Sequence, residues 1–371
     1  MNRSALRAAA LGATIVFTAS NRLTPSATVI SIPAGGSVNP EAAEKAVQIG
    51  PHGVIAATFE LPSRHSEVLR RTGVVSILRA PVPANRPDLQ YAELELGAIA
   101  ENGTVLANAH DFFDGAQLED DSTPLIFRSD NPPQAVPAAS CGKTLVESNA
   151  RVLAAQGGIL AITMQPAIDN AGDKDNGDLA PYAVEFSKRG CYRLGRATVQ
   201  ALRGRYAAGW RVYHGRYQSS TTLVFDRARY VAVRWYDRLL QELGPGVALD
   251  VAADGTAVGA DRYPEFDQGA FEHAVRARLW QTNGHAVDIG PVGFNSIAHA
   301  VDEHGRVVGM LEHKGRFDAF LWHDGHLKTL DDLLRQPDWH FEAAFDLSSD
   351  GRVAGVGRYH GVDSIFVATI P

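Results

Sequence analysis

Apolar and polar residues alternate along most of this chain, in short runs that meet at glycines. The clearest stretch runs from Ser296 to Leu334 and reads SIAHAVDEHGRVVGMLEHKGRFDAFLWHDGHLKTLDDLL. Alternation over a few residues is typical of a half-buried strand, and a glycine between two such runs is typical of a hairpin turn. The stretch therefore predicts four short antiparallel strands joined by tight turns.

The same order of segments returns from one end of the chain to the other. We find seven copies, and each has a glycine turn between its first two strands, at intervals of 46 to 55 residues. The turn glycines are Gly53, Gly103, Gly158, Gly204, Gly255, Gly305 and Gly351. A unit of about 50 residues with four short strands has the size of one propeller blade. The sequence thus predicts an all-β, seven-bladed β-propeller with four-stranded blades, as a single domain over residues 28–371.

The two ends of the repeat array complement each other. The seventh copy stops after its third strand, at about Ile370, and residues 27 to 33, ATVISIP, precede the first copy where a fourth strand would run. Pairing of these segments would complete the last blade and leave no open edge in the ring. The alternative is an open, twisted stack of hairpins.

The recurring phrase is similar to a known repeat. A glycine turn and VVG, then AFLW and an apolar close, resembles the HAF repeat, a family of extracellular repeats named for the His-Ala-Phe that often opens the third strand. Here the phrase reads DAFLW from Asp318 to Trp322, with Asp in the place of that His. The resemblance spans residues 45–371, and it is strong in copies four to six and degenerate in copies one to three. It implies an architecture and an exported location, and no reaction.

Charge and hydropathy exclude several classes of protein. The chain has 35 Lys and Arg against 42 Asp and Glu, a net charge of -7, so no nucleic acid or anionic membrane partner is indicated. No apolar run approaches the roughly 20 residues of a membrane helix. Arg3 and Arg7 before a small apolar run give residues 1–27 the layout of a signal peptide; the alternative is a frayed tail. We expect a secreted or periplasmic monomer.

Candidate ligand-binding residues cluster in one kind of loop. In a propeller, the glycine turns lie on one face, here called the glycine-turn face. The connections between second and third strands, and those between blades, lie on the opposite face, here called the loop face. Ligands tend to bind where such variable loops gather, or at the channel mouth.

The loop-face candidates combine imidazole, phenol, guanidinium and indole groups. They are His110, Tyr213, His214, Arg262, Tyr263, His313, Arg316, Trp339, His340, Tyr359 and His360. Such groups can bind a glycan or an anion, or place an acid and a base around a substrate. The alternative is that they are solvated side chains of polar loops.

An acidic loop offers the one candidate metal site. Asp169, Asp173, Asp175 and Asp178 bring carboxylates together at short spacing, which suits calcium. Its glycine falls one position earlier than an EF-hand requires, so a solvated acidic loop is the alternative. No other cofactor is expected.

Two further patterns concern packing. Trp235, Trp280 and Trp322, with Phe127 and Phe186, recur at one position of the third strand, and this predicts packing between blades. Cys141 and Cys191 are expected near opposite faces, roughly 15 Å apart for a five-residue strand, and therefore as free buried thiols. A disulfide between them is the alternative.

These observations favour an exported binding module that recognises a carbohydrate or a protein surface through the loop face. One alternative is a lyase or hydrolase that uses His, Tyr and Arg residues of these loops. Another is a structural or adhesion module without a small-molecule ligand. The sequence contains no catalytic motif that decides among them.

Overall fold

The glycine turns lie where the repeats predict them. The computed structural model describes residues 27–370, apart from gaps at 33–35, 39–44, 62–65, 80–92, 112–120, 129–132, 137–147, 167–181, 188–189, 214–228, 265, 268–269 and 272. All seven turn glycines have a positive φ, between 62° for Gly204 and 91° for Gly255. This is the left-handed region that favours glycine, so each turn fixes the point where a first strand reverses into a second.

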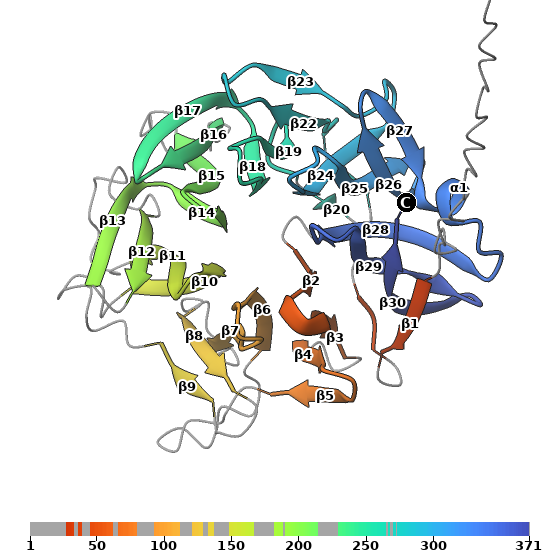
Figure 1. Cartoon of the computed structure of the whole chain (residues 1–371), viewed down its shortest axis with the longest axis horizontal. Coiled ribbons are helices and arrows are strands. Elements are labelled where there is room, and N and C mark those ends of the chain that lie inside the picture. Colours follow the sequence, from red (N-terminus) through yellow and green to blue (C-terminus); the bar gives the residue numbers. More distant parts are fainter. Residues whose placement is uncertain are drawn as a thin grey trace, which may run out of the picture.

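Within the described residues the strands form seven four-stranded antiparallel sheets, arranged as the blades of a β-propeller (Figure 1). The inner strands are β2 (Val47–Ile49), β6 (Glu93–Ile99), β10 (Ser148–Gln156), β14 (Thr198–Arg203), β18 (Val247–Val251), β24 (Asn295–Val301) and β28 (Trp339–Leu347). The second strands are β3 (Ile55–Glu60), β7 (Val105–Asp111), β11 (Ile159–Pro166), β15 (Tyr206–Tyr213), β19 (Ala257–Ala260), β25 (Val307–His313) and β29 (Arg352–Tyr359).

The outer half of each blade completes the sheet. The third strands are β4 (Ser66–Arg71), β8 (Asp121–Phe127), β12 (Tyr182–Ser187), β16 (Arg229–Tyr236), β22 (Ala277–Trp280), β26 (Arg316–His323) and β30 (Val362–Thr369). The outermost strands are β5 (Val75–Leu78), β9 (Gln134–Ala135), β13 (Gly190–Arg196), β17 (Leu239–Pro245), β23 (Ala286–Asp288), β27 (His326–Thr329) and β1 (Ala27–Ser31). A small hairpin of β20 (Phe266–Asp267) and β21 (Ala270–Phe271) lies in the connection between β19 and β22.

The chain ends close the ring as predicted. The first strand of the chain, β1, pairs antiparallel with β30, from Ala27 opposite Ala368 to Ser31 opposite Ser364. Ile30 of β1 is buried, with 2% of its surface exposed, in the core that joins the last blade to the first. The seventh blade is therefore built from both ends of the chain, and the alternative of an open stack is wrong.

Most inner strands carry a β-bulge at the same height. The ladder between first and second strands shifts register at Gln200 in β14, at His299 in β24 and at Phe345 in β28, among others. Gly309, the glycine of the VVG phrase, pairs with Ala298 beside such a bulge. A Cβ on Gly309 would clash with the carbonyl oxygen of Ile297, so this position requires glycine. The bulged residue is the extra one in its strand, and bulges re-aim side chains.

Aromatic residues of the third strands pack between blades. Trp235 and Trp280 are 1% and 0% exposed, and each lies in a hydrophobic cluster that joins residues of two neighbouring blades. Phe127, at the equivalent position of β8, is buried in the same way. The third-strand aromatic positions thus have the packing role that the sequence predicts.

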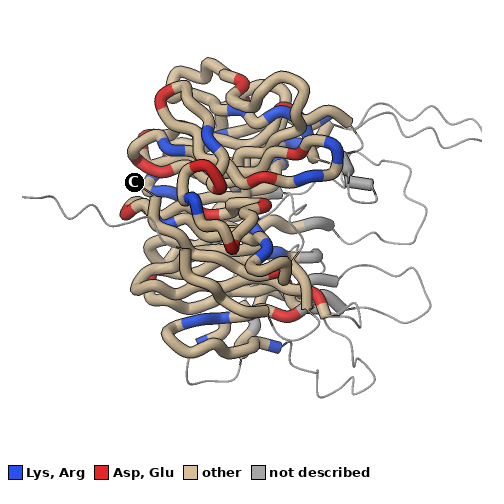
Figure 2. Tube along the Cα trace, turned by 90° about the vertical axis from the view of Figure 1, so that its right-hand side faces the viewer, with Lys and Arg blue, Asp and Glu red and all other residues tan. Residues whose placement is uncertain are grey.

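Helices are minor elements of the described residues. They are the 3-10 turn η1 (Pro51–Gly53) and the short helix α1 (Leu330–Leu334). No helix in this part of the chain is long and apolar enough to cross a bilayer. Seen from the side, the ring carries basic and acidic residues interspersed along the trace (Figure 2).

The prediction that Cys191 is a free thiol was wrong. Cys191 in β13 is disulfide-bonded, and the sequence holds one other cysteine, Cys141, which lies outside the described residues. The prediction of free thiols assumed a full-length fourth strand before Cys141. The structure ends that strand, β9, at Ala135. The six residues from Ala135 to Cys141 can span up to about 20 Å, which exceeds the separation of roughly 15 Å expected between the two cysteines.

Candidate functional site

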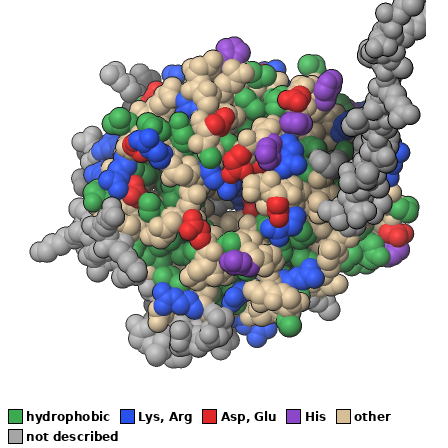
Figure 3. Space-filling view, viewed as in Figure 1, with side chains coloured by type: hydrophobic (Ala, Val, Ile, Leu, Met, Phe, Trp, Pro, Cys, Tyr) green, Lys and Arg blue, Asp and Glu red, His purple; other side chains and the backbone are tan. Residues whose placement is uncertain are grey.

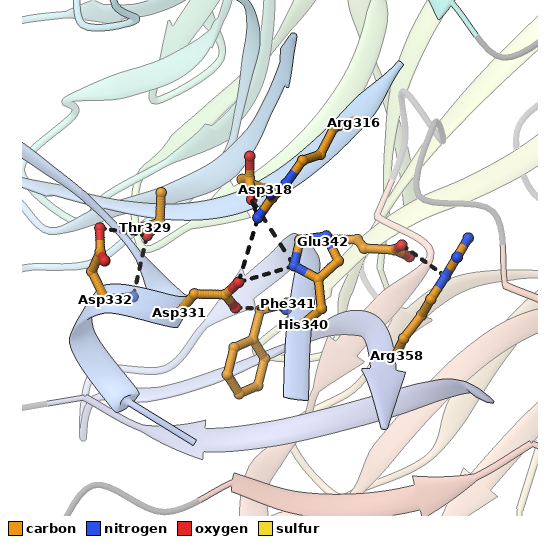
Figure 4. Close-up of polar contacts among 9 residues, drawn as sticks. All are labelled: Arg316, Asp318, Thr329, Asp331, Asp332, His340, Phe341, Glu342 and Arg358. Carbon is orange, nitrogen blue, oxygen red and sulfur yellow. Dashed lines mark hydrogen bonds and ion pairs between the residues drawn. The ribbon is translucent and has the colours of Figure 1, made fainter. Parts of the chain in front are cut away.

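The segment that connects the sixth blade to the seventh gathers charged side chains on the loop face. Thr329 caps α1, since its hydroxyl oxygen accepts from the backbone N–H of Asp332 at 3.2 Å. The cap fixes the first turn of the helix, which holds Asp331. The chain then enters β28, where His340 faces back toward that carboxylate (Figure 4). A short cap and a strand entrance thereby position an Asp–His pair.

Four side chains converge at this place, here called the His340 cluster: Arg316, Asp318, Asp331 and His340. The His340 Nδ1–H donates to Asp331 Oδ2 at 2.9 Å and lies 4.0 Å from Asp318 Oδ1. The other oxygen of Asp331 accepts from the backbone N–H of Phe341 at 2.9 Å. The guanidinium of Arg316 lies 3.0 Å from Asp318 and 3.9 Å from Asp331. Each group is therefore held in a defined direction (Figure 4).

Partial burial shifts the proton affinities in this cluster. The hydrogen bond from His340 to Asp331 raises the pKa of the imidazole above its usual value, although burial acts against this. Burial opposes ionisation of Asp331, but the hydrogen bonds from His340 and Phe341 outweigh it and lower the pKa of the carboxyl. The pair therefore favours a charged imidazole beside a charged carboxylate.

A second ion pair continues the polar surface along β28. Arg358 Nε lies 3.1 Å from Glu342 Oε1 and 3.7 Å from Asp363 Oδ1. Burial raises the pKa of the Glu342 carboxyl, and Arg358 acts against that rise. Together with the His340 cluster, this pair forms a band of planar polar groups in which exposed guanidinium groups contact partly buried carboxylates (Figure 4).

The same residues place three ligand-type atoms close together, as a cation site would require. One ligand atom from each of Asp318, Asp331 and His340 lies within 4.8 Å of the others. The guanidinium of Arg316 already pairs with Asp318 and lies near Asp331, and the His340 nitrogen in this set already donates to Asp331. A resident metal would have to displace both interactions, so these residues fit an internal ion-pair network better than a metal centre.

Among the described residues, the structure brings the predicted Arg316 and His340 together in the His340 cluster. It also brings Trp339, Tyr359 and His360 into ring contact in the seventh blade. Tyr213 donates to Glu242 Oε1 at 2.6 Å, and Tyr263 stacks on Tyr230 at 4.9 Å between ring centroids. His313 stacks on Phe294 at 4.6 Å. These residues have separate local partners, and the Tyr263–Tyr230 stack joins the fifth blade to the fourth.

Three further predicted loop-face residues differ in their surroundings and exposure. Arg262 is exposed and lies 3.9 Å from Asp261. Trp339 is 7% exposed and packs against Phe341 and Tyr359, so we assign it to packing beneath the loop face. His360 lies at the exposed end of the hairpin, 3.6 Å from Asp338.

Some predictions lie outside the described residues. These are the calcium ligands Asp169, Asp173, Asp175 and Asp178, and His214. The backbone of His110 lies in β7, but its side chain is outside the description.

Sequence reasoning missed both carboxylates of the His340 cluster. Asp318 stands where the resembled repeat has His, and it was treated as a strand residue. Asp331 lies in the apolar close of the sixth copy, TLDDLL. The Thr329-x-x-Asp332 spacing is a helix-capping signal that would have indicated a turn at this point, and hence an exposed carboxylate.

Comparisons with known proteins support the fold. No family model matches the chain, and no curated protein sequence matches it. Among solved structures, the β-propeller domain of the Trilobed protease from Pyrococcus furiosus is similar, with a TM-score of 0.52 and 10% identity over 86% of this chain and 93% of that one. That domain is described as having an open velcro topology, whereas here β1 pairs with β30.

Two enzymes are among the other similar structures. Uncomplexed acylaminoacyl peptidase from Pyrococcus horikoshii has a TM-score of 0.52 and 9% identity over 87% of this chain, which spans half of that protein. The polysaccharide lyase Uly1 has a TM-score of 0.47 and 8% identity, and 90% of each chain is covered. At such identities the likeness shows the fold alone, a β-propeller. Membership of the HAF-repeat family stays a prediction.

Proposed function

We propose that this protein is an exported binding module that recognises a carbohydrate through its loop face. The observation that carries the proposal is the His340 cluster, in which a guanidinium and an imidazole each lie within about 4 Å of the same two carboxylates. Each sugar hydroxyl both donates and accepts, so it suits a surface on which donors and acceptors alternate at fixed positions.

The geometry reduces the cost of binding. Side chains that already hold one another lose little rotamer freedom when a ligand arrives, and pre-organisation of this kind favours affinity. The neighbouring Glu342–Arg358 pair adds a second acceptor and donor along β28, and several such groups suit a sugar with several hydroxyls more than a single ion. A protein partner with a polar surface is the competing ligand, and the experiment below separates the two.

The disulfide at Cys191 supports the exported location. Structural disulfides form and persist in oxidising compartments and are rare in the cytosol. The signal-peptide layout of residues 1–27 supports the same proposal. Together they favour a secreted or periplasmic protein.

One observation favours a second candidate function, a lyase or hydrolase. In the Asp331–His340 pair the carboxylate holds Nδ1 of the imidazole, which directs Nε2 outward as a potential acid or base. Such an enzyme needs a further group that activates the substrate beside Nε2. Arg316 is the nearest cation within the described residues that could stabilise negative charge there.

The test is binding of the folded chain to a glycan array, with variants His340→Gln and Arg316→Gln. We expect each substitution to weaken a bound glycan by about tenfold or more, as for loss of a hydrogen bond to a charged group. His326→Gln is the matched control, because His326 is an exposed histidine in the turn that starts β27, on the glycine-turn face. Binding of a protein ligand and no glycan would refute the carbohydrate proposal. Turnover of a bound glycan that depends on His340 would establish the enzyme instead.

A further inference from the structure

The centre of the glycine-turn face is hollowed. A cavity of about 450 Å³ lies there, lined by the ends of the inner strands of six blades and by the turns that follow them. Acidic and basic side chains gather round the hollow in the space-filling view of this face (Figure 3). The cavity is the mouth of the central channel, and it lies on the face opposite the His340 cluster.

Most of the charges that line this cavity are paired. Lys45 Nζ lies 3.1 Å from Asp250 Oδ1 and 3.5 Å from Asp346 Oδ1, so one ammonium joins two blades that are far apart in the chain. Arg352 Nε lies 2.9 Å from Asp350 Oδ2 at the rim. These side chains balance one another's charges and form the polar wall of the cavity.

Two hydrogen-bonding side chains of the wall have no such partner. Gln200, the bulged residue of β14, is 6% exposed, and its buried Oε1 has no hydrogen-bond partner among the described residues. Arg203, at the end of the same strand, has a buried Nε that is equally unmatched in this part of the chain. Both residues line the cavity, so an unused acceptor and an unused donor lie three residues apart on one strand.

The charge of the Arg203 guanidinium is balanced, although its Nε–H is unmatched in the described part of the chain. Burial lowers the pKa of its guanidinium, but the surrounding carboxylates, first Asp250 and Asp346, outweigh this and raise it. The cation is thus compensated at longer range, while its Nε–H has no acceptor among the described residues. A ligand that completes this site has to supply hydrogen bonds and no net charge.

We propose that the channel mouth binds a small neutral saccharide, with hydroxyl groups placed between Arg203 and Gln200. A hydroxyl oxygen accepts from the guanidinium, and a neighbouring hydroxyl donates to the Gln200 oxygen. An anion would meet Asp250, Asp346 and Asp350 in the same cavity, and a cation would meet Lys45, Arg203 and Arg352. The site is separate from the loop-face site and stands whether or not that site binds a ligand.

The cavity has the dimensions that this ligand class requires. Ligand sites in proteins range from roughly 300 to 1,000 Å³ and place a few polar groups precisely. The apolar Leu153 and Leu202 also line the mouth, and they offer the contacts that the C–H faces of a sugar ring need. Rigid inner strands carry all of these groups, so the site is built before the ligand arrives.

The experiment is isothermal titration of the full chain with glucose, galactose, mannose and N-acetylglucosamine. Glucuronate and glucosamine serve as charged comparators. Arg203→Lys keeps the charge and removes the planar fork, while Gln200→Leu removes the acceptor at similar volume. We expect each variant to weaken the tightest neutral sugar by about tenfold. Arg205→Lys is the matched control, since Arg205 lies on the same face, outside this cavity, and is paired with Asp237.

The outcomes separate this proposal from the loop-face one. A neutral sugar that binds to the natural chain and to Arg205→Lys, and binds more weakly to both channel variants, supports a saccharide site at the channel mouth. Tighter binding of glucuronate or glucosamine overturns it, as does the absence of binding by every neutral sugar. Binding that is lost in His340→Gln and kept in Arg203→Lys places the ligand on the loop face and also overturns it.

Discussion

Replacing Lys45 with methionine tests whether the ion pairs of the channel hold the ring together. Lys45 precedes the first inner strand, and its ammonium bridges Asp250 of the fifth blade and Asp346 of the seventh. The three side chains are only 15%, 4% and 12% exposed. Methionine keeps the length of the side chain and removes its charge. The variant therefore leaves two nearly buried carboxylates without their shared cation.

The expected loss follows from what those carboxylates retain. Asp250 Oδ2 still accepts from the backbone N–H of Val301 at 3.0 Å, and Asp346 Oδ2 from that of Ile49 at 2.7 Å. Backbone hydrogen bonds do not replace a neutralising charge at this depth. Removal of one member of a buried ion pair typically costs 3–5 kcal/mol, and we expect Lys45→Met to lower the free energy of unfolding by about 3–5 kcal/mol.

Urea denaturation followed by far-UV circular dichroism and tryptophan fluorescence measures this change. The matched control is the double variant Lys45→Met/Asp250→Asn, in which the amide oxygen still accepts from Val301 and the Asp346 carboxylate still balances the charge of Arg203. We expect it to recover stability to within about 1–2 kcal/mol of the natural chain, because the remaining carboxylate and guanidinium offset each other. A loss below about 1 kcal/mol in Lys45→Met would refute the reasoning, and so would a double variant that is less stable than the single one.

Further predictions concern closure, the orphan acceptor, the disulfide and pH. Ile30→Ala should cost about 2–5 kcal/mol in urea denaturation, because it opens a cavity where β1 closes the ring. Gln200→Leu should raise stability in the absence of ligand by about 1–3 kcal/mol, since it removes an unmatched buried acceptor, whereas a structural role would lower it. Cys191→Ala should cost about 2–5 kcal/mol, and a reductant should no longer affect that variant. The His340–Asp331 pair should contribute its full stability between pH 3.8 and 6.5. That contribution should fall above pH 6.5, as the pH passes the raised pKa of His340, and below pH 3.8, as it passes the lowered pKa of Asp331. Denaturation of the natural chain and of His340→Gln across this pH range measures it.

The fold was predictable because its determinants are local and repeated. A glycine such as Gly305, with a φ of 74°, indicates a turn directly in the sequence. The alternation of apolar and polar residues indicates which side chains face the neighbouring blades. Closure was predictable because the seventh copy lacks a strand that the N-terminal segment supplies. Each of these signals needs only a few consecutive residues to be read.

The candidate sites were predictable only in part, because they depend on contacts between distant segments. His340 stood out because it falls outside the repeat register, but its partner Asp331 is hidden in an apolar phrase of the sixth copy. In the channel, Lys45 and Asp250 are 205 positions apart and meet only when the ring closes. The repeat pattern predicts the strands of each blade, but it does not predict which residues of different blades meet at the channel axis.

The bulges of the inner strands explain why the channel can acquire a site without loss of the fold. A bulged residue is surplus to the hydrogen-bonded ladder, so its side chain is less constrained by the blade than those of its neighbours. The equivalent position holds Leu249 in β18, His299 in β24 and Phe345 in β28, while β14 has Gln200. The blades thus keep one packing plan while this position changes from apolar to polar. A repeat fold with one such position in most blades can therefore vary the side chains of its channel from blade to blade. At Gln200 this variation places an unmatched acceptor at the channel wall, where a ligand can donate a hydrogen bond to it.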